Sequence, residues 1–89
     1  MIFTRRFQNE IKAIFDFIAD DSYARAVKFY DELISKIENI ENNPLAYPKS
    51  KTAKRDNARD LIYKGYVIPF LIYDEIHILG IYKHNIWKP

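Results

Sequence analysis

Two histidines are the side chains best suited to proton transfer near neutral pH, and both fall late in the chain. His77 and His84 lie seven residues apart in a segment predicted to be a single strand. Because strand side chains alternate between faces, an odd separation puts the two imidazoles on opposite faces, where they neither chelate one metal nor act as a pair. We expect His77 at the surface near a turn. His84, beside Lys83 and near Trp87, is placed to move a proton or to contact phosphate.

Basic side chains form a second group, concentrated in the segment KSKTAKRDNAR. Its five cations, Lys49, Lys51, Lys54, Arg55 and Arg59, are accompanied by one acidic residue, Asp56. Residues 1–48 carry a net charge of −2, whereas residues 49–89 carry +4. A segment this basic, without apolar periodicity, is not a core element. It suits binding to phosphates or to an acidic protein surface, and the alternative is a solvated loop that keeps the domain soluble.

Composition excludes several kinds of catalytic site. The chain has no cysteine, which excludes thiol catalysis, disulfides and thiolate zinc sites. It has only two glycines and hence no glycine-rich phosphate loop, and its serines lie outside any nucleophile motif. Asp16, Asp20 and Asp21 cluster near a predicted helix end, where carboxylates usually serve capping and solubility. We therefore expect neither a metal nor a cofactor.

The 89 residues predict one globular domain over residues 1–89, since 48% are hydrophobic and 29% are charged. The longest apolar run, residues 66–73, is far shorter than a membrane span. The first ten residues lack the apolar stretch of a secretory signal. We therefore expect a cytoplasmic protein that does not associate with a membrane.

Apolar residues at helical spacing predict two amphipathic helices. The first covers residues 7–18 and is interrupted by Asp20-Asp21-Ser22, where Asp21 or Ser22 can cap the next helix. The second covers residues 23–40, about 30 Å at ~1.5 Å per residue, and ends before Pro44, because proline cannot donate and disfavours helix in the residue before it. So short a connection makes the two helices antiparallel neighbours.

Strand patterns flank these helices. An edge strand is expected at residues 2–4, and three further strands at 58–64, 66–73 and 76–84 follow a long loop over 44–57. The fold class is therefore α+β in the order β-α-α-β-β-β, with the N-terminal helical hairpin on one face of a mainly antiparallel sheet. Pro69 cannot donate to a ladder, so we expect a bulge there or an N–H position that faces away from a partner.

Both faces of the predicted sheet are apolar. Within residues 66–73, Ile68 and Phe70 share one face, and Val67 and Leu71 share the other. A helical hairpin covers only one face, so the second is expected to be shielded by the 44–57 loop, by a second copy or by a different protein. The alternative is that tyrosines with polar tips tolerate half-exposure.

These patterns together resemble the ParE/RelE superfamily of bacterial type II toxins. The helical part of the resemblance lies in FQNEIKAIFDFIADDSYARAVKFYDELISKIENIENNPLAYP, where an apolar helix with an acidic turn precedes a longer helix with a proline-marked stop. The strand part lies in ARDLIYKGYVIPFLIYDEIHILGIYKHN, with an arginine-leucine strand, a Tyr-Val-Ile strand, a turn and a last strand that ends near a histidine. The resemblance covers residues 2–85.

The resemblance implies a toxin of a type II toxin–antitoxin system, neutralised by a cognate antitoxin that wraps it with a helix or an extended segment. A homodimer or a heterotetramer with the antitoxin is the implied assembly. ParE-like members bind DNA gyrase and are not nucleases, whereas RelE- and YoeB-like members cleave mRNA in the ribosome. A third interpretation is a non-toxic protein-binding module.

The resemblance also implies roles for individual residues. Arg59 resembles the strand arginine that RelE- and YoeB-like enzymes hold near the scissile phosphate, and His84 resembles their penultimate histidine, so both are catalytic only if the protein is an endoribonuclease. Asn85 replaces the tyrosine that follows that histidine, and no glutamate lies between residues 44 and 57. A ParE-like gyrase inhibitor is therefore favoured. Lys51 and Lys54 fall in the loop where the resemblance implies functional lysines. Together with Lys49, Arg55, Lys83 and Trp87, which their charge or position in the sequence makes candidates, they are the residues expected to bind a target or nucleic acid.

Overall fold

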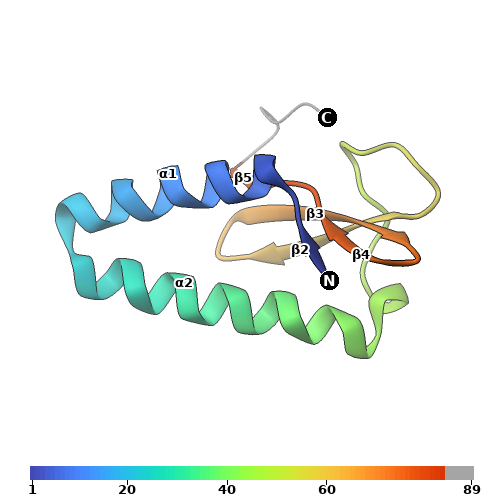
Figure 1. Cartoon of the computed structure of the whole chain (residues 1–89), viewed down its shortest axis with the longest axis horizontal. Coiled ribbons are helices and arrows are strands. Elements are labelled where there is room, and N and C mark those ends of the chain that lie inside the picture. Colours follow the sequence, from blue (N-terminus) through green and yellow to red (C-terminus); the bar gives the residue numbers. More distant parts are fainter. Residues whose placement is uncertain (84–89) are drawn as a thin grey trace.

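The computed structural model describes residues 1–83, and its elements follow the expected order (Figure 1). They are β1 (Ile2–Phe3), α1 (Arg5–Asp21), α2 (Tyr23–Glu38), the 3₁₀ turns η1 (Asn39–Asn42) and η2 (Pro44–Ala46), β2 (Ala58–Tyr63), β3 (Tyr66–Tyr73), β4 (Glu75–Ile78) and β5 (Tyr82–Lys83). The α+β class and the helical hairpin on one side of the sheet are confirmed. Within residues 1–83, no helix is long and apolar enough to cross a membrane.

Polar caps fix where the two helices begin. The Thr4 side chain accepts a hydrogen bond from the Phe7 N–H and starts α1. Ser22 serves both helices, because its N–H donates to the Ile18 carbonyl at the end of α1 and its hydroxyl accepts from the Arg25 N–H at the start of α2. Of the two caps that the sequence allowed, Ser22 is therefore the one used. With one extended residue between them, the helices fold back as antiparallel neighbours (Figure 1).

The sheet has the strand order β1-β4-β3-β2, with β5 pairing to β3 beyond the end of β4. The β1 strand runs parallel to β4, while the β2–β3, β3–β4 and β3–β5 pairs are antiparallel. Two strands thus share one side of β3 and β2 occupies the other. Among the described residues, β1, β2 and β5 each pair with one named strand and so lie at the edges of the sheet.

Pro69 accounts for the division of the last strand into β4 and β5. The register of β3 is Phe70 with Ile78 on β4 but Val67 with Tyr82 on β5, so the partner chain holds one extra residue between these pairs. The Pro69 carbonyl accepts from the Leu79 N–H at 2.9 Å, but its nitrogen has no proton to continue the ladder. The expected bulge at Pro69 is confirmed, and the expected continuous strand over residues 76–84 is wrong for the same physical reason.

A carboxylate from α1 compensates for the broken ladder. The Ile81 N–H, next to the break, donates to Glu10 Oε1 at 3.0 Å. Glu10 also forms an ion pair with Arg6, one helical turn earlier, with 3.2 Å between Arg6 Nε and Glu10 Oε2. The helix therefore satisfies a backbone donor in the segment between β4 and β5.

The core lies between the hairpin and one face of the sheet. The helices contribute apolar side chains spaced one and two turns apart along their inner faces. The sheet contributes the side chains of the face that carries Leu61, Ile68 and Phe70. Its fully buried side chains include Phe7, Leu33, Ile37, Ile40, Ile68, Phe70 and Ile78. At about 1.5–3 kcal/mol for each large apolar side chain removed from water, this layer is the main source of stability.

The opposite face, called here the far face, is partly covered by the loop over residues 48–57. Ala58, Asp60, Pro69 and Tyr82 belong to this face and are buried. Because the loop is one of the three covers that the sequence allowed, no second polypeptide is needed over these residues. Outside the loop, the far face leaves Ile62 63% and Tyr73 65% exposed.

Candidate target-binding surface

The basic segment is a loop fixed to the sheet. Pro48 and Ser50 lie along β2, where the Asp60 N–H donates to the Pro48 carbonyl at 2.9 Å and the Ser50 N–H donates to the Ala58 carbonyl at 3.0 Å. The Lys51 N–H then donates to Asp60 Oδ2 at 3.2 Å. A buried carboxylate thus anchors the loop through its backbone, which leaves the lysine side chain free to extend into solvent.

The four cations assigned to binding in this loop are all exposed: Lys49, Lys51, Lys54 and Arg55. Their backbone is held by further short contacts, such as the Ala53 N–H donating to Ser50 Oγ at 3.1 Å. Buried Ala53 turns the middle of the loop towards the protein. The result is a positive surface whose cations are displayed on an anchored backbone, which reduces the entropy lost when a partner binds.

A shallow hollow connects this loop to the end of β3. It is lined by Lys54, Arg55, Asp56, Asn57, Leu71 and Tyr73. Asn57 holds the junction, because its side chain donates to the Ile72 carbonyl at 3.1 Å and its own carbonyl accepts from the Ile72 N–H at 2.9 Å. The candidate surface therefore combines cations with an exposed tyrosine, and both tyrosine and arginine are enriched in protein interfaces.

Tyr73 and Leu71 were not identified as binding candidates from the sequence. The strand pattern predicted only that they lie on the face of the sheet away from Phe70. The register shows that Leu71 sits opposite Ala58, the residue at which the basic loop joins β2. The available signal was the short distance in sequence from the loop to the start of β2, combined with the antiparallel return of β3.

Arg59 lies on the face of the sheet that carries the helices. It is opposite Phe70, and its Nη1 donates to the Tyr47 carbonyl at 2.9 Å and approaches the Leu45 carbonyl at 3.5 Å. The Tyr47 ring packs edge-on against Phe70 at 5.5 Å between centroids. Arg59 therefore holds the 45–47 segment over the end of the core, and its buried Nε has no partner among the described residues.

The remaining candidate residues do not gather with the loop. Lys83 is exposed at the opposite end of β3, where its Nζ lies 5.5 Å from the centre of the Tyr66 ring. His77 is half-buried near the β3–β4 turn, and its Nε2 lies 3.0 Å from the Tyr73 carbonyl, which matches the expected position. His84 and Trp87 lie outside the described residues.

A carboxylate–phenol pair lies on the hairpin side, between α2 and the end of β2. The Tyr63 hydroxyl donates to Glu32 Oε1 at 2.5 Å, and Lys64 Nζ lies 3.2 Å from the same oxygen. Hydrogen bonds from Tyr63 and Lys64 lower the pKa of Glu32, while burial and the bond to Glu32 raise the pKa of Tyr63. Both shifts stabilise the native protonation states at neutral pH, so the pair supports structure rather than proton transfer.

No group of three His, Cys, Asp or Glu side chains within residues 1–83 is arranged to hold a metal ion. The candidate surface of the described part consists of an anchored cationic loop and a neighbouring exposed tyrosine, both positioned by β2 and β3.

A solved structure shares the fold of this chain. Over 93% of this chain and 92% of the other, the fold matches a chain of the chromosomal ParDE toxin–antitoxin system from P. aeruginosa, with a TM-score of 0.75 and 18% identity. At that identity the match establishes a shared fold. No match was found among curated proteins.

The family follows from the sequence. Residues 1–86 match the family model described as the ParE toxin of the type II toxin–antitoxin system parDE. The chain therefore belongs to the ParE toxin family. The resemblance inferred from the residue patterns is confirmed, and a cognate antitoxin is the partner that membership implies.

Proposed function

We propose that this toxin inhibits growth by binding DNA gyrase, and that the basic loop and Tyr73 form the contact surface. The observation that carries the proposal is the anchored loop with its four exposed cations, two of which, Lys54 and Arg55, line a hollow together with the exposed Tyr73. A cationic loop of this kind suits phosphates or an acidic protein surface, and an enzyme that holds DNA brings phosphates to its binding partners. A binder of this kind needs affinity and shape, and it needs no catalytic residues.

The contacts of Arg59 support this reading over an mRNA nuclease. In a nuclease the guanidinium would stabilise charge on a scissile phosphate. Here it faces the hairpin side and donates to backbone carbonyls, on the side of the sheet opposite Asp60 and the loop that Asp60 anchors. Moving Arg59 to a phosphate would require breaking the contact that holds Tyr47 against the core.

Neutralisation by the antitoxin completes the proposed cycle. The antitoxin covers apolar surface that the toxin leaves exposed, in a heterodimer or a heterotetramer, and release of the antitoxin frees the toxin for gyrase. Exposed apolar side chains on the hairpin, such as Phe17 and Tyr23, and Ile62 on the far face offer the area that such a cover needs.

Induced expression with two parallel readouts tests the proposal. Plasmid supercoiling and mRNA integrity are followed after induction of the wild type and of a variant with Lys49, Lys51, Lys54 and Arg55 changed to Gln. The matched control changes four exposed cations on the helices to Gln: Arg5, Lys12, Arg25 and Lys28. We expect growth arrest with relaxed plasmid and intact mRNA for the wild type and the control, and growth for the loop variant. Cleaved mRNA with normal supercoiling would contradict gyrase as the target.

A further inference from the structure

We propose that an extended, acidic segment of the antitoxin adds as a strand to the outer edge of β2, from Asp60 to Lys64. Side chains of this segment then enter the groove between β2 and α2. The inference deepens the proposed function, since it rests on neutralisation by an antitoxin, and it adds the place and the chemistry of one contact. The surface is separate from the basic loop and from Tyr73.

The hydrogen-bond pattern identifies the free edge. The Ile72 N–H donates to the Asn57 carbonyl, so odd-numbered residues of β2 direct their backbone groups towards β3 and even-numbered ones direct theirs outward. Ala58 and the Asp60 N–H are paired by residues 48–55 of the loop. Beyond them, the outward backbone groups of Ile62 have no backbone partner among residues 1–83.

Pro48 explains why the loop stops at that point. It lies opposite Asp60 and accepts the Asp60 N–H, but a proline nitrogen cannot return a hydrogen bond to the Asp60 carbonyl. The added strand of the loop therefore ends there, and three successive outward groups remain: the Asp60 carbonyl, the Ile62 N–H and the Ile62 carbonyl. An exposed row of this kind is a template for another extended chain.

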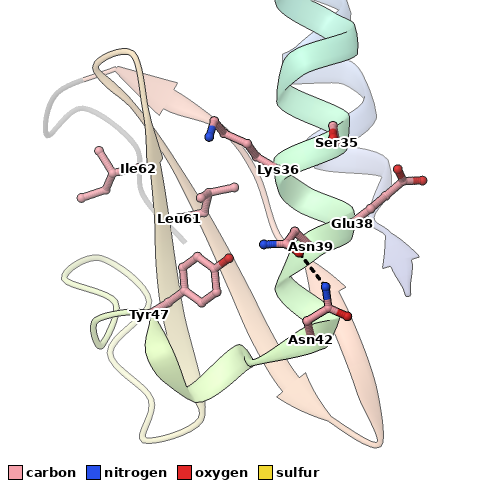
Figure 2. Close-up of a pocket in the computed structure, with 8 residues that line it drawn as sticks. All are labelled: Ser35, Lys36, Glu38, Asn39, Asn42, Tyr47, Leu61 and Ile62. Carbon is pink, nitrogen blue, oxygen red and sulfur yellow. Dashed lines mark hydrogen bonds between the residues drawn. The ribbon is translucent and has the colours of Figure 1, made fainter.

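A groove of about 650 Å³ runs between this edge and α2. In Figure 2, Tyr47, Leu61, Lys36 and Asn39 point into the space between the strand and the helix, while Ile62 and Glu38 point away from it. The floor is thus apolar at Leu61 and Tyr47, and polar groups of α2 and η1 form the far wall. The Asn42 side chain donates to Asn39 Oδ1 at 2.6 Å, which fixes part of that wall.

Charge decides which occupant fits. Lys36 reaches into the groove and has no ion pair among the described residues, whereas Glu38, which also lines the groove, points away from it. Lys64, just after β2, is already paired with Glu32 at 3.2 Å, so Lys36 is the cation that an occupant meets. A second copy paired through the same edge would bring Lys36 towards its own equivalent, because two-fold contacts are self-complementary. An acidic segment of a different protein gains attraction where a second copy meets repulsion.

The pairing also predicts a sequence pattern in the partner. A residue opposite Leu61 faces the groove against Tyr47 and is best apolar. A residue opposite Tyr63, two positions along the same face, lies near Lys36, whose Nζ is 5.7 Å from the centre of the Tyr63 ring, and is best acidic. The bound segment therefore carries an apolar and an acidic residue separated by one position.

Binding of the purified antitoxin to paired variants tests the site. Ile62→Pro removes the outward N–H, which the fold does not use, whereas Ile62→Ala removes the side chain and keeps the N–H. We expect Ile62→Pro to weaken the complex about tenfold in titration calorimetry, and Ile62→Ala to stay within about threefold. Lys36→Glu weakens it as well, while Lys28→Glu, on the same helix outside the groove, does not. Equal binding by all four variants would overturn the proposal.

Amide exchange on the wild type keeps the test independent of variant folding. We expect the Ile62 amide to exchange rapidly in the free toxin and slowly in the complex. An amide that still exchanges rapidly in the complex would overturn the site, and protection in the free protein with dimerisation would replace the antitoxin by a second copy. In either case arrest of growth and its reversal by the antitoxin would still stand. Absence of arrest would instead contradict the proposed function.

Discussion

At the scale of single residues, the Glu32–Tyr63 pair couples the hairpin to the sheet. Its hydrogen bonds lower the pKa of Glu32 below the ordinary value of 4.5. A carboxyl whose pKa is lower in the folded state stabilises the fold above the unfolded pKa, and the gain is lost as pH falls through the folded value. We therefore expect the wild type to lose stability below about pH 4.5 more steeply than Tyr63→Phe does. Thermal melts between pH 6 and pH 3 measure this, and identical pH profiles would contradict it.

Arg59 offers a second test at this scale. Because its guanidinium donates to the Tyr47 carbonyl and covers the end of the core, Arg59→Ala is expected to lower the free energy of unfolding by about 1–3 kcal/mol. Urea denaturation measures the loss. The variant is expected to remain toxic at a temperature at which it is folded, because the proposed gyrase contact does not use Arg59. Loss of toxicity and of mRNA cleavage in a fully folded Arg59→Ala variant would instead favour a nuclease.

At the scale of elements, one buried carboxylate anchors the backbone of the basic loop at Lys51. Asp60 is 4% exposed and accepts the Lys51 N–H, so Asp60→Ala removes the anchor of the loop backbone. We expect trypsin to cleave after Lys51, Lys54 or Arg55 at least about fivefold faster in this variant, because proteolysis follows local opening. Asp56→Ala, an exposed acidic residue of the same loop, is the control and is expected to cleave at the wild-type rate. Equal rates for both variants would show that Asp60 does not hold the loop.

Local chemistry explains which elements the sequence could predict. Ser22 was identifiable as a cap from its type and position, and Pro69 as a bulge from its missing proton, because both effects act within a few residues. The division of β4 from β5 required knowing which side of β3 faces which neighbour, a property of the register. The orientation of Arg59 towards Tyr47, and the meeting of Tyr73 with the loop, likewise depend on contacts between distant segments that no local pattern contains.

At the scale of the whole molecule, the two proposed surfaces differ in how they bind. The loop surface presents four exposed cations to the target, and the β2 edge presents an open ladder beside Lys36 to the antitoxin. Since the loop cations are exposed, their attraction is screened by salt. We expect the affinity of the toxin for its target to fall as salt rises from 50 to 300 mM, with a smaller slope for the variant in which the four loop cations are Gln. Equal slopes in a binding assay would contradict a role for the loop.

The most direct test of the central claim is supercoiling of relaxed plasmid by purified gyrase in the presence of purified toxin. The account predicts inhibition by the wild type, relief on addition of the antitoxin, and little inhibition by the variant in which the four loop cations are Gln. Full gyrase activity at a several-fold excess of folded toxin would contradict it.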